Sequence, residues 1–334
     1  MLRDAMRAID ALARAHVLFA TLVFRLRGAY ARGYSFCSDH AISNLLLHHS
    51  PMSTTDWSRR RTLLQIGAND LHAGNDGDVR YAVVSGGVRA VLVEAHPLVF
   101  PRLAETVGAI NRKESNDRLA ALNVAVCPVG GESSSNATFW SVSPRFLRDF
   151  PSAPHWVRSE LASLNERATR TSVEYFFNVY LKRPQRMRPD YIEAVNVPCA
   201  NMQRIFELGQ IEPEAVDIFV VDTEGLDAHV MLDALRVPGF APLVIVFEQK
   251  VAARLSPREL QAVGLQLKER NYTLHNHTQV NADRSVTLGD LVACSHKTRG
   301  VTLATGHISK TVVLPGSERS KTTQTKTGFK TRET

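Results

Sequence analysis

Cysteine is scarce in this sequence of 334 residues, and no two cysteines lie close together in it. The four cysteines are Cys37, Cys127, Cys199 and Cys294. None of them belongs to a CxxC pair, which argues against a zinc site and against a disulfide framework. We interpret them as free, mostly buried thiols in a reducing, cytoplasmic compartment. N-x-T triplets, which carry no meaning in that compartment, begin at Asn136, Asn271 and Asn276.

Long apolar runs are also lacking in the N-terminal part of the chain. The apolar stretch from Val17 to Phe24 is only eight residues long, too short to span a bilayer. Residues 1–35 repeat apolar side chains three or four positions apart, which predicts a helix. We expect residues 1–60 to form a helical extension and a linker, with the helix packed on the main domain or lying on a membrane surface as a peripheral contact.

A signal peptide is the alternative interpretation of the same N-terminal segment. The small residues Ala29 and Ala31 flank Tyr30 in the manner of a cleavage site. Asp4 and Asp10 argue against export, because a leader of this kind is cationic before its apolar core.

Apolar residues almost disappear at the other end of the chain, in residues 315–334. This basic, low-complexity tail cannot bury enough surface to offset the entropy of ordering it, so we expect it to be disordered. The whole chain has a net charge of +7, with 44% apolar and 22% charged residues, as in an ordinary soluble protein. No aromatic RNA-binding signature is visible, and we expect no nucleic-acid partner.

The third glycine of a dinucleotide-binding fingerprint is missing after the first predicted strand. Thr62–Ile66 is an apolar run that ends in Gly67, as a buried parallel strand does before a tight turn. The next predicted strand, Arg89–Glu94, ends in a carboxylate, which in a βαβ nucleotide-binding unit accepts hydrogen bonds from ribose hydroxyls. The residues after Gly67 cannot be written as G-x-G-x-x-G, so the turn does not predict a pyrophosphate site.

Strand and helix patterns alternate over residues 61–314, which we take as one domain. The predicted strands after the first two are Ala121–Val126, Ala137–Val142, Ala194–Pro198, Val216–Asp222, Leu243–Phe247, Tyr272–His275 and Leu291–Cys294. The predicted helices are Val79–Ser85, one opened by Pro97 with Leu98, Phe100, Leu103 and Val107 on its core face, Met202–Leu208, and Pro257–Arg270 with Ser256 as its N-cap.

The alternation is interrupted by residues 144–193, a basic segment rich in aromatic side chains. One interpretation is a helical insertion whose aromatic residues form a small core of their own. The other is a cap over the active site that selects the substrate, with His155 and Trp156 facing it. The two interpretations are compatible, and the sequence favours neither.

Polar side chains stand at the ends of several predicted strands. Ligands of open parallel sheets bind beyond the carboxyl ends of the strands, where the strand order reverses. A glycine turn at one strand end and carboxylates at three others therefore predict a binding site at this edge. The strand-end residues are Gly67, Asn69 and Asp70, then Glu94, Asn123, Asp222 with Glu224, and Glu248.

In these segments the sequence resembles the FkbM family of S-adenosylmethionine-dependent methyltransferases. The most specific combination is Asp222-Thr-Glu-Gly-Leu-Asp227 together with Gly67-Ala-Asn-Asp70, and the resemblance covers roughly residues 60–296. Leu71 departs from the family, which usually has glycine there. The matching segments are Gln65–Asp70, Val93–Pro97, Asn123–Val126, Val197–Cys199, Asp217–Gly225 and Val246–Glu248.

The resemblance implies an α/β class I methyltransferase fold, which is Rossmann-like, with a mostly parallel seven-stranded sheet and one antiparallel strand near its edge. It also implies S-adenosylmethionine as cofactor and methyl transfer to an oxygen of a sugar, glycan or polyketide-like acceptor. Carried over by position, Glu94 would hold the ribose. The residues implied at the methionine part are Gln65, Gly67, Ala68 and Asn69, and those implied beside the adenine are Asn123 and Ala125.

Methyl transfer to an alcohol requires an aligned acceptor and a group that removes its proton. Asp222 and Glu224 are the candidate catalytic residues, and Asp227 and Glu248 are candidate acceptor contacts. The carboxylates could instead hold a divalent cation, which the spacing does not decide, although we favour the metal-free version. Asp222 could also be merely the cap of the following helix.

Two other functions remain compatible with the sequence. A nicotinamide-dependent oxidoreductase shares the βαβ layout with its terminal acid, although the absent third glycine argues against it. A non-catalytic binding module, tethered through its basic tail, belongs to a different class of protein. The sequence identifies neither the acceptor nor the oligomeric state.

Overall fold

The computed structural model describes residue 42 and residues 61–71, 77–84, 87–127, 135–182, 185–280 and 286–295. The predicted N-terminal extension with its membrane contact and the predicted disordered tail lie outside these residues, apart from Ile42, which is buried. None of the described helices has the length and apolar character needed to cross a membrane.

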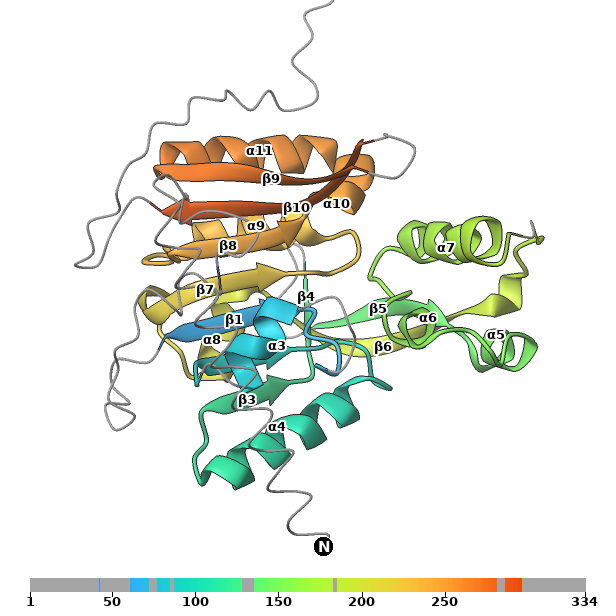
Figure 1. The fold of residues 1–334 in the computed structure, drawn as a ribbon, viewed down its shortest axis with the longest axis horizontal. Helices are drawn as coiled ribbons and strands as arrows, with labels where there is room; N and C mark the ends of the chain where they lie inside the picture. The colour runs from blue at the N-terminus through green and yellow to red at the C-terminus, as the bar shows by residue number, and fades with distance from the viewer. Residues whose placement is uncertain are drawn as a thin grey trace, which may run out of the picture.

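A seven-stranded sheet with the order β3-β2-β1-β7-β8-β10-β9 forms the centre of the fold (Figure 1). Every pairing between neighbours is parallel except those of β10, which runs antiparallel to both β8 and β9. This mostly parallel sheet confirms the predicted class I methyltransferase fold. Its strands are β1 (Thr62–Ile66), β2 (Arg89–Val93), β3 (Leu119–Leu122), β7 (Val216–Val221), β8 (Val244–Glu248), β9 (Tyr272–Val280) and β10 (Val286–Ser295).

The strand order reverses between β1 and β7. The chain leaves β1 toward β2 and β3, whereas β7 leads toward β8 on the other side. Such a reversal leaves a crevice beyond the carboxyl ends of the two strands, because their connecting segments diverge there. At the opposite end of the strands, Asp217 accepts hydrogen bonds from the Thr62 N–H (3.1 Å) and the Arg61 guanidinium (3.0 Å), which ties β7 to β1.

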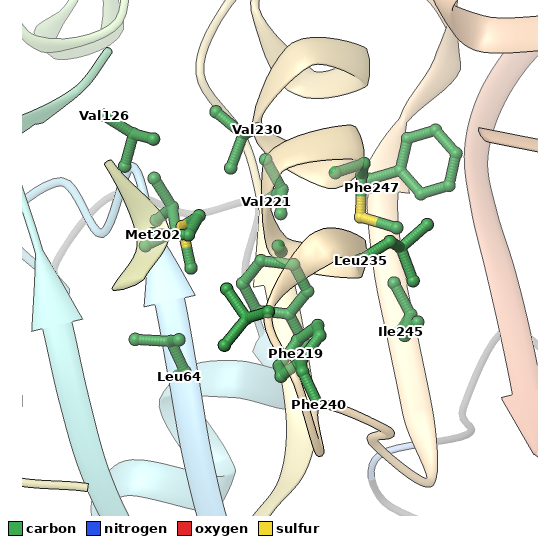
Figure 2. Close-up of a cluster of buried hydrophobic side chains, with 14 of the residues drawn as sticks. Leu64, Val126, Met202, Phe219, Val221, Val230, Leu235, Phe240, Ile245 and Phe247 are labelled. Atoms are coloured by element: carbon green, nitrogen blue, oxygen red, sulfur yellow. The ribbon is translucent and has the colours of Figure 1, made fainter. Parts of the chain in front are cut away.

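Helices cover both faces of the sheet, and the alternation of strand side chains sorts the core between them. In β1, Leu64 and Ile66 pack with helices α8, α9 and α11, whereas Leu63 packs with α3 and α4. Figure 2 shows part of the first cluster, where Phe219 lies beside Phe240 and Leu64. The helices are α3 (Gly77–Val84), α4 (Phe100–Glu114), α8 (Met202–Gly209), α9 (Asp227–Arg236), α10 (Gln249–Leu255) and α11 (Pro257–Glu269).

Two local predictions were wrong, and a third is confirmed for the position of the residue but not for its capping hydrogen bond. The predicted strand Ala121–Val126 is divided at Asn123, whose amide donates to the Glu94 carbonyl (2.8 Å), so the chain leaves β2 there and continues as β4 (Ala125–Val126) in a second sheet. Leu98 is 63% exposed, because α4 begins two residues later. Ser256 occupies the N-cap position of α11, but its side chain accepts no capping hydrogen bond.

The helices of the interrupting segment lie in the chain between β5 and β6, two strands of a second sheet. The sheet has the order β4-β6-β5, with β5 antiparallel to β6, and it carries the helices away from the carboxyl ends of β1, β7 and β8 (Figure 1). Phe146, Phe176 and Phe177 are fully buried in one aromatic cluster, which confirms that the insertion has its own core. Its elements are β5 (Ser135–Val142), α5 (Pro144–Asp149), α6 (His155–Ser159), α7 (Glu166–Tyr175), the π-helix η2 (Phe176–Tyr180), η3 (Pro189–Tyr191) and β6 (Ile192–Ala200).

The prediction of free thiols is contradicted. Cys127 and Cys199 form a disulfide that joins the end of β4 to β6, with a Cα–Cα distance of 5.6 Å. Cys294 is also in a disulfide, and the described residues contain no free cysteine. The spacing in the sequence gave no sign of the first bond, because Cys127 and Cys199 are 72 positions apart and only the second sheet brings them together.

Candidate active site

The turn after β1 lies against the end of β7. Gly67 has a φ of +80°, and the N–H groups of Gly67 and Ala68 both donate to the Val93 carbonyl, at 2.9 and 3.0 Å. A Cβ atom on Gly67 would overlap the carbonyl oxygen of Asp222. Glycine is therefore required both by the left-handed backbone and by the contact with the next strand.

Left-handed conformations continue in the two loops that meet here. Asn69 and Leu71 have φ angles of 51° and 59°, and Glu224 has a φ of 52°. Non-glycine residues adopt this conformation at a cost and cluster at ligand-binding and catalytic sites. This concentration at the carboxyl ends of β1 and β7 marks the reversal of strand order as the candidate site.

Glu94 joins the turn after β1 to the tip of β2. Its two carboxylate oxygens accept hydrogen bonds from the Asn69 N–H (2.8 Å) and the His96 N–H (2.7 Å). Burial raises its pKa to about 7, and the nearby Asp70 carboxylate adds to the rise. Each oxygen retains a lone pair for a further donor, as recognition of two neighbouring hydroxyls requires.

Asp70 and His96 are functional candidates that the sequence analysis did not assign. The Asp70 side chain is almost fully buried beside Glu94, and its carboxylate is 3.5 Å from the Arg102 guanidinium. The buried imidazole of His96 contacts the Phe139 ring edge-on, and burial lowers its pKa to about 4, so it is neutral at neutral pH. Asp70 belongs to the Gly-Ala-Asn-Asp motif, and this motif is the feature of the sequence that could have assigned it to the site.

The loop between β7 and α9 is organised by Asp227. Its carboxylate is fully buried and accepts hydrogen bonds from the N–H groups of Thr223 and Gly225, both at 3.1 Å. Burial raises its pKa to about 6. Asp227 therefore shapes the loop that presents Asp222 and Glu224. Asp222 does not occupy the N-cap of α9, which is Leu226.

The structure brings some predicted cofactor residues together around these loops. Gln65 is fully buried in β1, and Asn123 directly follows β3, where its amide donates to the Glu94 carbonyl at the tip of β2. Ala125 is buried in β4 beside Cys199. Glu248 ends β8, the strand next to β7.

Of the two predicted acceptor contacts on the insertion, Trp156 packs against its aromatic core. Trp156 packs edge-on against Phe176 and Tyr180 in the aromatic cluster of the insertion. His155 begins α6, the same short helix. The part of the insertion that reaches the site is α7, because Ala168 lies beside Gly225, at 3.4 Å from where a Cβ of that glycine would be.

Among the described residues, no group of three or more histidine, cysteine, aspartate and glutamate side chains is arranged to hold a metal ion.

No family model and no curated protein matches the sequence. Among solved structures, the chain is similar to methyltransferase FkbM from Methylobacillus flagellatus KT, with a TM-score of 0.39, 13% identity and coverage of 70% of this chain and 43% of that one. It is similar to the METTL16 methyltransferase domain, with a TM-score of 0.35, 9% identity and coverage of 77% and 80%. It is also similar to the human methyltransferase 10 domain containing protein, with a TM-score of 0.34, 11% identity and coverage of 78% and 80%.

The chain thus spans less than half of the length of the FkbM structure. Likenesses this distant carry no functional argument. The fold follows from the strand order itself, and the function has to be argued from the geometry of the site.

Gly67→Ala should destabilise the protein by several kcal/mol, because the new methyl group overlaps the Asp222 carbonyl in addition to straining the backbone. Gly87→Ala is the matched control: Gly87 also has a positive φ, of +67°, but nothing lies within 4 Å of its Cβ position. It should lose only about 1 kcal/mol, the cost of the backbone conformation. Urea unfolding measures both losses, and equal losses would contradict the close contact.

Glu94→Gln should become more stable relative to the wild type as the pH rises. The pKa of Glu94 is about 7 in the folded protein against an ordinary value of 4.5, so the unfolded chain loses this proton first. The wild type therefore loses stability as the pH rises from about 4.5 to about 7, by about 3 kcal/mol at most, and the glutamine variant lacks this loss. Chemical unfolding near pH 5 and near pH 8 measures the change.

The exposed Glu105 on α4 supplies the control, since Glu105→Gln should keep the same stability difference from the wild type at both pH values. If the difference in free energy of unfolding between the wild type and Glu94→Gln is also the same at both pH values, the folded protein does not raise the pKa of Glu94.

Proposed function

We propose that this protein is an S-adenosylmethionine-dependent O-methyltransferase. The observation that carries the proposal is the buried Glu94 carboxylate, hydrogen-bonded to the glycine turn at the reversal of strand order. A carboxylate in this position suits the ribose of a nucleoside cofactor. The fold is shared by enzymes that use this cofactor, which supports the choice by analogy only.

The charge of the site favours a sulfonium cofactor over a dinucleotide. Asp70, Glu94, Asp222 and Glu224 all belong to the loops at the ends of β1, β2 and β7. Together they disfavour a doubly charged pyrophosphate, whereas a sulfonium and an α-ammonium group are positive. S-adenosylmethionine supplies an activated methyl group when it is bound, and no phosphate has to be held.

Each loop has a distinct part in this proposal. The positive φ of Gly67 and the absence of a large side chain at Ala68 let the methionine part approach the backbone closely, next to Gln65 and Asn69. The ribose hydroxyls donate to the remaining lone pairs of Glu94. Asn123 and Ala125 lie where the chain passes from β3 to β4, and in this proposal they would flank the adenine.

Asp222 and Glu224 are the proposed acid–base residues. Asp222 follows β7 directly and its N–H donates to the Ile66 carbonyl at 2.9 Å, which fixes it beside the glycine turn. A carboxylate there can accept the proton of an acceptor hydroxyl while the methyl group is transferred in line. Asp227 positions this loop, and Glu248 on the next strand is a proposed acceptor contact. The acceptor class, a sugar, glycan or polyketide-like hydroxyl, comes from the sequence resemblance.

A nicotinamide-dependent oxidoreductase is less compatible with the geometry. In a dinucleotide fold the pyrophosphate rests on the N-terminus of the helix that follows the glycine turn directly. Here residues 68–71, which directly follow Gly67, are not helical, and α3 is described from Gly77 onward.

Glu94→Ala should weaken binding of S-adenosylmethionine and of its demethylated product by about tenfold to a hundredfold, because a charge-assisted bond to a ribose is worth roughly 1.5–3 kcal/mol. Wild-type affinity should also rise with pH through the pKa of about 7, since the carboxylate is the better acceptor. Calorimetry measures both effects, and Glu105→Ala should bind like the wild type. Binding of NAD in place of S-adenosylmethionine would overturn the proposal.

Asp222→Asn should keep cofactor affinity but lose about a hundredfold in turnover, the usual scale for a removed acid–base group. The acceptor needed for this assay can be sought by mass spectrometry of small molecules and glycans, as a methyl-sized mass difference between cells with and without the protein. A variant that turns over normally but unfolds more easily would assign Asp222 a structural role instead.

A further inference from the structure

We propose that this chain matures in an oxidising, secretory compartment and carries N-linked glycans on Asn136 and Asn271. The inference is independent of the proposed methyltransferase function. It rests on the disulfides, which contradict the reducing compartment expected from the sequence, and on where the structure places two N-x-T triplets.

Disulfides form and persist where the surroundings are oxidising, and they are rare in the cytosol of most cells. The Cys127–Cys199 bond is built into the fold: Cys127 donates its N–H to the Ala200 carbonyl at 2.9 Å, and Cys199 is buried in β6. Cys294, buried in β10 of the main sheet, is in a second disulfide. Two bonds in separate sheets indicate a chain whose cysteines are oxidised as it folds.

Asn136 and Thr138, the two defining residues of the first triplet, share the solvent-facing side of β5. Both are exposed, whereas Phe139 on the opposite side is buried against Val197. β5 is the edge strand of its sheet. The Asn136 side chain has no hydrogen-bond partner in the described part of the protein, so a glycan there displaces no contact.

Asn271 lies in the turn between α11 and β9 and is exposed, with a φ of 62°. Asparagine tolerates this conformation better than most residues. β9 runs in the same direction as β8, because both are antiparallel to β10. Asn271 is therefore at the end of the sheet opposite to the candidate active site, where a glycan leaves the crevice open. The third triplet begins at Asn276, and the structure does not describe its side chains.

The modification is an oligosaccharide transfer from a lipid-pyrophosphate donor. The bond between the anomeric carbon of the sugar and the pyrophosphate oxygen breaks, and a bond from that carbon to the asparagine Nδ2 forms. The amide gives up one proton, and the lipid pyrophosphate is the leaving group. No oxidant or reductant is required for this step.

The test expresses the full chain, with its own N-terminal segment, in a eukaryotic cell and measures its electrophoretic mobility before and after digestion with a peptide N-glycanase. We expect digestion to increase the mobility. Asn136→Gln and Asn271→Gln should each lose the part of this mobility shift that one glycan causes. Thr138→Ala should act like Asn136→Gln, because it destroys the same triplet. Thr138→Ser changes the same position of β5 but preserves the triplet, so it should retain the glycan and serves as the control for effects on folding. Asn178→Gln is the control, because Asn178 is exposed but begins no triplet.

Alkylation of the unfolded, unreduced chain reports on the cysteines in the same samples, and we expect no labelled thiol. If digestion with the glycanase leaves the mobility of the chain unchanged, the proposal is overturned, whether the thiols are bonded or free. A digestible chain in which the Asn136 and Asn271 variants both migrate like the wild type overturns the two assigned positions.

Discussion

The contact between the turn after β1 and the end of β7 is the constraint on which the site depends. Gly67 allows the Asp222 carbonyl to approach where any side chain would overlap it, and the Val93 carbonyl holds the turn through two N–H groups. Three neighbouring strands are thereby locked at their carboxyl ends. These contacts hold the predicted ribose acceptor, Glu94, and the predicted base, Asp222, on either side of the same glycine turn.

Electrostatics explains why so many acids can be kept at one edge of the sheet. The Asp70 carboxylate lies 3.5 Å from the Arg102 guanidinium. The buried carboxylates of Glu94 and Asp227 each accept hydrogen bonds from two backbone N–H groups. These hydrogen bonds oppose the desolvation that raises their pKa values, so both groups stay close to the pH range in which they can ionise. A cationic ligand would favour their ionisation further.

The sheet could be predicted from the sequence because its strands are buried on both faces and read as continuous apolar runs. Features that depend on contacts distant in sequence could not. Asn123 ends a strand through its bond to the Glu94 carbonyl, although Leu122 and Val124 are both apolar. The Cys127–Cys199 bond needs the second sheet. The site loops were found from their polar residues, whereas the contact of Trp156 with the core of the insertion needed the structure.

The insertion meets the site through small residues. Beside the β7–α9 loop, Gly225 has a φ of +123°, and a Cβ atom there would lie 2.8 Å from Leu255 of α10 and 3.4 Å from Ala168 of α7. Two helices from different parts of the chain therefore contact the loop that Asp227 holds through its hydrogen bond from the Gly225 N–H. Because Val173 of α7 is buried in the aromatic core of the insertion, α7 joins this core to the loop that carries Asp222 and Glu224.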